Sequence, residues 1–342
     1  MSDRRLDSFQ KLALATTGTT YLLILVGGLV RAAGAGLGCP DWPRCFGSWV
    51  PPTRADQLPP GFDPAQFNAV LTWIEYLNRL LGVLVGFLVF ATLVAAIARH
   101  RRTPRVLRPT LAAFLLVGYE GWLGGQVVAH GLQPWIVTAH LVVALLIVSL
   151  LLYATVNAFF PAVSFPAVSA AGPHRRLVAR AGWALLALTL AQVALGTQVR
   201  SRVDEVGGRD AGARAASPVP RSEWLSRAGP VDGAHRTASL LVLAGALGVF
   251  GLVRRRETGG PLAAAAGTVV ALTGAQIGTG VVLAYLALPR TAQVAHLALA
   301  SLLLGAETLV ALLARRLPET PAPDRPSGTP AAPSRLEAAP RG

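Results

Sequence analysis

The chain has 342 residues, of which 53% are hydrophobic and 14% charged, and its formal net charge is +14. A mean hydropathy of +0.50 excludes an ordinary water-soluble domain, and two cysteines are too few for a disulfide-built fold. The basic residues stand in short clusters between apolar runs, which is typical of membrane topology signals rather than of a nucleic-acid-binding surface. We therefore expect a protein of the lipid membrane that does not bind nucleic acid.

Apolar runs long enough to cross a bilayer, which takes about 20 residues, recur along most of the chain. The first run lacks a convincing cleavage signal, so we expect it to be retained as a span. The fold class predicted is an all-α membrane protein with eight transmembrane helices. They cover residues 12–33, 69–97, 109–129, 134–158, 178–200, 232–253, 261–287 and 291–314.

Arginine clusters set the predicted direction of these spans. The clusters follow the second, fourth and sixth spans, at residues 99–108, 175–176 and 254–256. Since basic loops stay in the cytoplasm, the termini, residues 1–11 and 318–342, are predicted to be cytoplasmic, and the loops 34–68 and 201–231 to face outward. We expect a multi-pass plasma-membrane protein whose tail, rich in Pro, Ala and Ser, is disordered.

An internal repeat is visible in the polar residues of the spans. Three pairs lie 156 residues apart: Glu120 and Gln276, Gly124 and Gly280, and His140 and His296. The dipeptide Asn78-Arg79 matches His235-Arg236 at a separation of 157. Four spans per half give both halves the same orientation, so we expect two pseudo-symmetric four-helix bundles. These halves are residues 12–158, with the outer loop 34–68, and residues 178–314.

Glycines recur at similar heights on the odd-numbered spans, at positions 27, 124, 196 and 280. A missing side chain lets two helices, or a helix and a flat ligand, approach closely. The sequence leaves both interpretations open.

Three histidines, His140, His235 and His296, lie a few residues inside the outer ends of even-numbered spans. A polar side chain in a span is costly and tends to mark a site, although a single one is more often a hydrogen-bonded structural residue. Three at one depth favour metal or haem. His235 and His296 come from different helices of one bundle, as two axial haem ligands would, whereas zinc would need further ligands at that depth.

Charged residues lie next to positions 78 and 235, the two equivalent positions that Asn78 and His235 occupy in the repeat; we call these and the positions of His140 and His296 ligand-type positions. Arg79 and Arg236 each follow such a position by one residue and are predicted to pair with haem propionates; the alternative is that they snorkel toward lipid headgroups. Glu75 stands one helical turn before Asn78, where a carboxylate must be paired, protonated or in a polar cavity. We favour a proton-handling or substrate-orienting role for Glu75 over a purely structural pairing with Arg79.

Cys39 and Cys45 lie six residues apart in the predicted outer loop. Because that side of the membrane is oxidising, a disulfide is favoured. It would pin a loop rich in Pro and Trp over the first bundle. A redox-active pair is the alternative.

Five segments together resemble the haem A synthase family, over about residues 12–314: GLVRAAGAGLGCPDWPRCFGSW, IEYLNRLLG, LQPWIVTAHL, GAHR and VAHLALA. The resemblance implies an oxidoreductase that makes haem A for cytochrome oxidase by oxidising the C8 methyl of haem O to a formyl group, through successive hydroxylations. It implies haem O or haem A in the first half, with Glu75 as catalytic carboxylate and His140 as haem ligand. It also implies haem b between His235 and His296.

The same resemblance suggests a haem O synthase and cytochrome oxidase assembly factors as partners. The sequence identifies neither the electron donor nor any homo-oligomer.

The chain departs from the family pattern at Asn78, where that pattern has histidine. Asparagine is a poor iron ligand, so a haem held by His140 alone would be five-coordinate, with an open position suited to oxygen chemistry. Two alternatives are that His130 replaces the missing ligand or that the activity has been lost.

Two other function classes compete with this interpretation. A non-enzymatic haem b membrane protein would use the same histidines to pass electrons from a quinol. A transporter, which duplicated halves also permit, predicts a discontinuous helix at mid-membrane.

Overall fold

The computed structural model describes residues 6–159, 172–257 and 259–316. Within these ranges the regular elements are helices, and the backbone pairing of Cys45 with Ser48 is an isolated bridge. The predicted all-α class is therefore confirmed. The tail expected to be disordered lies outside the described residues.

Eight helices have the length and apolar composition to cross a membrane. They are α1 (Ser8–Ala33), α2 (Ala69–His100), α3 (Pro104–Ala129), α4 (Pro134–Phe159), α5 (Pro173–Gly207), α7 (Pro230–Arg254), α8 (Pro261–Tyr285) and α9 (Arg290–Arg316). These match the eight predicted spans, and each runs unbroken, so the discontinuous helix that a transporter would need is not found among them. The short helix α6 (Ala211–Ala215) lies in the loop between α5 and α7.

Several helices extend beyond the predicted spans. α1 begins at Ser8 because Asp7 accepts a hydrogen bond from the Gln10 backbone N–H (2.8 Å) while the Gln10 side chain accepts one from Asp7 (3.0 Å). α3 begins at Pro104, a first-turn position where a missing N–H costs little. α5 continues to Gly207, into the predicted outer loop. Hydropathy marks only the part of a helix that lies in lipid, whereas the hydrogen-bonded helix continues into charged sequence.

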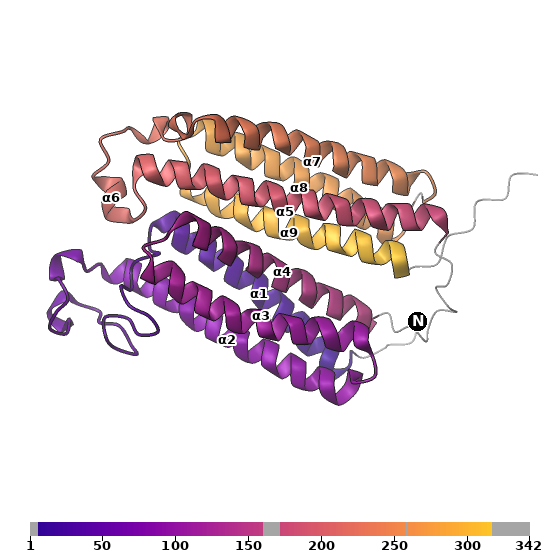
Figure 1. Ribbon diagram of the computed structural model, residues 1–342, viewed down its shortest axis with the longest axis horizontal. Coiled ribbons are helices and arrows are strands. Elements are labelled where there is room, and N and C mark those ends of the chain that lie inside the picture. The colour runs from indigo at the N-terminus through magenta and orange to yellow at the C-terminus, as the bar shows by residue number, and fades with distance from the viewer. Residues whose placement is uncertain (1–5, 160–171, 258, 317–342) are drawn as a thin grey trace, which may run out of the picture.

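The helices form two groups, α1–α4 and α5 with α7–α9 (Figure 1). They meet through α1 and α4 of the first group and α5 and α9 of the second. The loop that follows α1 and the helix α6 lie at the same end of the molecule (Figure 1). This arrangement is compatible with the two pseudo-symmetric bundles that the repeat predicts.

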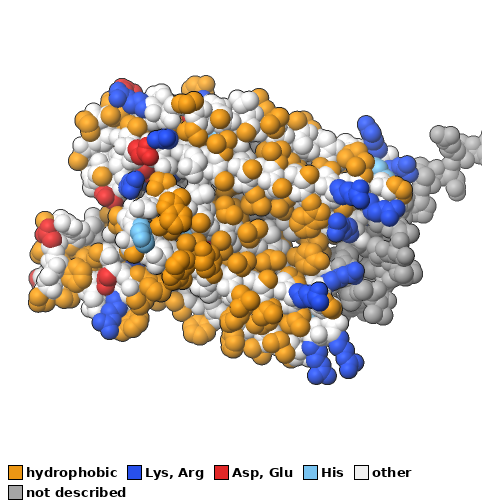
Figure 2. Space-filling model, viewed as in Figure 1, with side chains coloured by type: hydrophobic (Ala, Val, Ile, Leu, Met, Phe, Trp, Pro, Cys, Tyr) orange, Lys and Arg blue, Asp and Glu red, His pale blue; other side chains and the backbone are white. Residues whose placement is uncertain are grey.

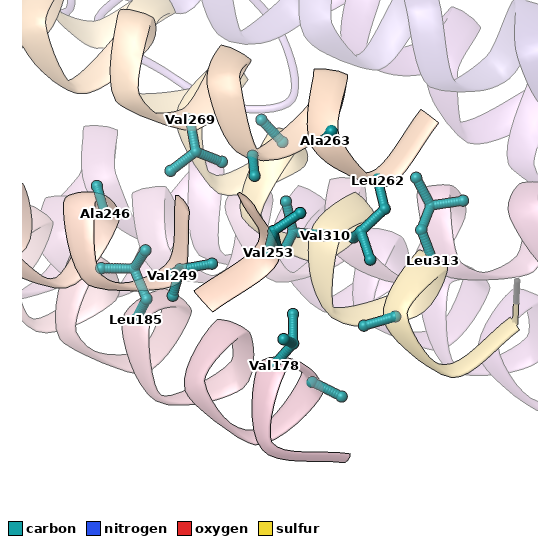
Figure 3. Close-up of a cluster of buried hydrophobic side chains, with 14 of the residues drawn as sticks. Val178, Leu185, Ala246, Val249, Val253, Leu262, Ala263, Val269, Val310 and Leu313 are labelled. Carbon is teal, nitrogen blue, oxygen red and sulfur yellow. The ribbon is translucent and has the colours of Figure 1, made fainter. Parts of the chain in front are cut away.

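A buried apolar cluster closes the second group at the end far from α6 (Figure 3). Its members come from the start of α5 and α8 and the end of α7 and α9; they include Val178, Leu185, Val249, Val253, Leu262, Val269, Val310 and Leu313. Tight packing here keeps the four helices together. The candidate ligands His235 and His296 lie near the other ends of α7 and α9.

Candidate functional site

A cavity of about 1920 Å³ extends between the helices of both groups. Small-molecule pockets are usually roughly 300–1,000 Å³, so this one has room for more than one ligand. Its lining includes all the predicted site residues of the spans: Glu75, Asn78, Arg79, His140, His235, Arg236 and His296. The fold therefore brings both halves of the predicted site to one continuous space.

Each ligand-type side chain packs against a glycine of a neighbouring helix. A Cβ on Gly196 would lie 2.9 Å from His235 Cε1, closer than carbon atoms pack, so the imidazole occupies the space that glycine leaves. The corresponding distances are 3.5 Å from Gly124 to His140, 3.5 Å from Gly280 to His296 and 3.8 Å from Gly27 to Asn78 Oδ1. The repeated glycines thus make room for the ligand-type side chains, and Asn78 occupies the fourth equivalent position.

Nδ1 of each histidine ring lies close to a polar side chain of a neighbouring helix. His140 Nδ1 lies 3.0 Å from Glu120 Oε1, and His235 Nδ1 lies 3.1 Å from Gln192 Nε2. His296 Nδ1 lies 3.0 Å from Thr279 Oγ1. None of these three contacts uses Nε2. A histidine ligand usually donates one ring N–H to an acceptor while the other nitrogen binds the metal. Glu120 and Thr279 offer an oxygen acceptor to His140 and His296 for this arrangement. Gln192 instead places its amide nitrogen, a donor, against Nδ1 of His235.

The two halves differ in what they offer to haem iron. α7 and α9 both pack on α5 and α8, and His235 of α7 and His296 of α9 line the same cavity between them. Two imidazoles suit the two faces of a haem. In the first group α2 and α4 have the same relation, but the residue of α2 that lines the cavity with His140 is Asn78, whose buried Oδ1 has no hydrogen-bond partner among the described residues. The residues present therefore fit one bis-imidazole haem and one haem with a single imidazole ligand.

Glu75 is buried, with 4% of its surface exposed, and both of its carboxylate oxygens accept hydrogen bonds. Oε1 accepts from Arg79 Nη2 (2.5 Å) and Nε (3.2 Å), and Oε2 accepts from the backbone N–H of Cys39 (2.8 Å). The ion pair with Arg79, one of the two roles considered from the sequence, is present. Glu75 also lines the cavity, so its structural role leaves room for the chemical one.

Arg79 fastens the outer loop to α2. A guanidinium has five N–H donors, and two of those of Arg79 go to Glu75. The other three go to the backbone carbonyls of Asp41 (2.7 Å), Arg44 (2.9 Å) and Cys39 (3.2 Å). No donor of Arg79 is left over for the predicted contact with a propionate. Its counterpart Arg236 is half exposed and pairs with Asp232 (2.7 Å).

The outer loop is closed by a disulfide between Cys39 and Cys45, as predicted. Gly38 presses against α2 so closely that a Cβ would lie 2.5 Å from the Leu71 carbonyl oxygen, which only glycine allows. Two tryptophans of the loop, Trp42 and Trp49, line the cavity. The disulfide loop therefore forms part of the wall of the first-half site.

Sequence reasoning left Glu120 without a role and did not single out Gln192 or Thr279. A signal was available, because Glu120, Gln192 and Gln276 each precede a repeated glycine by four residues, one helical turn. His130, the alternative ligand, is exposed, does not line the cavity, and has Nδ1 3.0 Å from the Gln126 carbonyl oxygen.

The sequence matches, over residues 10–308, a family described as cytochrome oxidase assembly protein. It is 31% identical to a protein named heme A synthase from Methylorubrum extorquens, over 88% of this chain and 85% of that protein. It is 29% identical to the heme A synthase of Methylobacterium radiotolerans, over 92% of each chain. A shorter match, 32% identical over 36% of this chain and 37% of the relative, is to the heme A synthase of Shewanella oneidensis.

Proposed function

We infer, because this chain belongs to the cytochrome oxidase assembly protein family, that it acts as a haem A synthase, an oxidoreductase that converts haem O to haem A. The observation that carries the finer assignment is the unequal pair of sites in one cavity. The half with two imidazoles suits a retained haem b. The half with one imidazole and an open face suits the haem whose C8 methyl is oxidised to a formyl group, through successive hydroxylations.

In the first half the chain's own residues hold and enclose the substrate. His140, fixed by Glu120, would bind the iron of haem O from one side, while Asn78 leaves the other side open. Iron porphyrin supplies the redox chemistry when it is bound. Trp42 and Trp49 of the disulfide loop, which line the cavity, would border the porphyrin on the outer-loop side.

Glu75 is the residue we propose for proton transfer at the substrate. Its carboxylate is held in one orientation by Arg79 and by the Cys39 backbone N–H, at the cavity wall. A fixed carboxylate can accept the proton that the substrate carbon or its hydroxyl group loses on oxidation. Its counterpart in the second half, Asp232, pairs with Arg236 close to the helix start.

The test is the yield of formyl haem from cells that supply haem O, measured by mass after haem extraction. We expect Glu75→Gln to lower the yield by about 10²- to 10⁴-fold, the usual contribution of general acid–base catalysis, while Asp232→Asn leaves it unchanged. The haem absorption of each variant is recorded to show that the protein is folded. A Glu75→Gln variant with full yield would remove Glu75 from the mechanism, and haem O recovered unmodified from the wild type would favour a non-enzymatic electron carrier.

The spin state of the bound haems tests the ligand assignment. The wild-type protein should show one low-spin haem, with two imidazoles, and one high-spin haem, with His140 alone. Asn78→His should convert the high-spin signal to low spin in absorption and electron paramagnetic resonance spectra. Two low-spin haems in the wild type would contradict single-sided ligation.

Cytochrome oxidase assembly is the context in which the family works. We further propose that a haem O synthase transfers haem O to this protein and that haem A is delivered to the oxidase. A plasma-membrane location and assembly into homo-oligomers are also proposals. Co-purification from membranes that contain each tagged partner tests the first two.

A further inference from the structure

Three arginines converge on one buried aspartate between the two groups of helices. Asp204 of α5 is 4% exposed. Its carboxylate pairs with Arg31 at the end of α1, with Arg200 one turn earlier in α5 (3.0 Å) and with Arg214 of α6 (3.2 Å). One carboxylate cannot balance three guanidinium groups, and uncompensated buried charge is costly. The cluster therefore has the electrostatic character of a site for a further anion.

Two donors of this cluster are unused. Arg31 Nη1 and Arg200 Nε are buried, and neither has a hydrogen-bond partner in the described parts of the chain. Both arginines line the cavity, whereas Arg214 does not. Arg214 instead donates to backbone carbonyls such as that of Gly208 (3.1 Å), and burial together with the neighbouring Arg200 lowers its pKa. The free hydrogen-bonding capacity thus belongs to Arg31 and Arg200.

Arg200 is linked to each proposed ligand of the second-half haem through one intervening residue. It follows Gly196, which packs on His235, by one helical turn. Its Nη1 donates to Gln293, which precedes His296 by three residues on α9. Arg200 therefore lies on the outward side of the place where the two imidazoles would hold a porphyrin.

Arg31 has the same position in the first half. It follows Gly27 by four residues, as Arg200 follows Gly196, and Gly27 packs on Asn78. One arginine from each half thus reaches the same aspartate from its own part of the cavity. The hydrogen bond of Arg31 to Asp204 joins residues 173 positions apart and links the two halves.

We propose that Arg31 and Arg200, held together by Asp204, form a carboxylate-binding site that anchors porphyrin propionates, Arg31 in the first half and Arg200 in the second. The proposal rests on the proposed function, since it requires haem in the cavity. A guanidinium can grip a carboxylate through two parallel hydrogen bonds. Arg79, which the sequence left equally open to a propionate or to lipid headgroups, has all its donors engaged by Glu75 and the loop.

The experiment compares haem with its dimethyl ester, in which the propionates carry no charge. The purified full-length protein, stripped of haem, is titrated with each compound, and the low-spin and high-spin absorption bands report the two sites separately. The wild type should bind the free acid more tightly than the ester, on the order of tenfold or more at each site. Arg200→Gln should abolish this preference at the low-spin site and Arg31→Gln at the high-spin site.

Further variants distinguish charge from geometry. Arg200→Lys keeps the charge but loses the paired donors, so it should show an intermediate preference. The matched control is Arg202→Gln, on the same helix, because Arg202 is exposed and pairs with Glu205 at the surface (2.8 Å). The band of the site that is not altered shows that each variant is folded.

The outcomes separate this proposal from the function on which it rests. A wild type in which neither compound develops the low-spin or the high-spin bands of bound haem contradicts haem binding itself. If haem binds but the preference for the free acid is unchanged in Arg31→Gln and Arg200→Gln, the carboxylate site is wrong and haem binding stands. A preference lost only in Arg236→Gln would place the propionates at that arginine instead.

Discussion

Glu120 and Gln276 occupy equivalent positions in the two halves, but Glu120 meets its histidine through a side-chain carboxylate, whereas Gln276 meets His296 through its backbone. Glu120 Oε1 lies 3.0 Å from His140 Nδ1, whereas His296 Nδ1 is 3.0 Å from the Thr279 hydroxyl. When a carboxylate pairs with the imidazole nitrogen that does not bind iron, the imidazole becomes a stronger donor to iron than it does with a neutral partner. The proposed substrate site and the proposed haem b site therefore differ by one charged group beside the ligand.

Replacing that carboxylate should change the electronic properties of one haem only. We expect Glu120→Gln to raise the reduction potential of the high-spin haem and to lower formyl-haem yield by about 10- to 100-fold, the usual effect of removing a partner of a metal ligand. Potentiometric titration followed at each absorption band is the measurement. The reciprocal Gln276→Glu serves as control and should leave the high-spin potential unchanged; a high-spin potential that does not move in Glu120→Gln would contradict this role.

At the scale of the helices, the site depends on backbone positions without side chains. α5 contributes Gly196, against which the His235 ring of α7 lies. α1, α3 and α8 contribute glycines in the same way. Glycine thus determines both how closely two helices approach and how the histidine ring between them is oriented.

Filling one of these positions should therefore remove one haem. Gly196→Leu places a side chain where the His235 ring lies, so we expect the low-spin haem to be lost and about one haem per chain to remain. Gly248→Leu on α7 is the control, because nothing lies within 4 Å of a Cβ at that position. Haem content per protein, from pyridine haemochrome spectra, is the measurement, and two haems in Gly196→Leu would contradict this use of glycine.

At the scale of the whole molecule, charge is distributed unevenly along the axis of the bundle. Apolar side chains cover the middle of the visible face, basic side chains without acidic ones gather at one end, and acidic and basic side chains are mixed at the other (Figure 2). The arginine clusters at residues 99–108 and 254–256 fall on the α2–α3 and α7–α8 connections. This asymmetry supports the prediction that these connections are cytoplasmic.

Cysteine labelling in intact cells tests the orientation. Both native cysteines are in the disulfide, so an introduced thiol is the only free one expected. A membrane-impermeant maleimide should label Ser222→Cys, in the loop before α7, and should label Arg102→Cys only after lysis; both positions are exposed. The reverse pattern would place the termini outside.

The sequence by itself determined the eight spans, because lipid selects long apolar runs whatever the helices contact. It also indicated the candidate ligands, because Gly and His residues of the two halves recur at a constant separation along the chain. The span ends were less accurate, because capping at Asp7 and helical continuation to Gly207 depend on hydrogen bonds rather than on hydropathy.

Only the tertiary structure decided what each charged residue binds. Arg79 holds the outer loop, Glu120 reaches His140, and Arg31 meets Asp204 from the other half of the chain. These contacts join separate helices and loops, so no local periodicity encodes them. Burial made them specific, because a charged group removed from water must find a particular partner, and only the packed helices determine which one is in reach.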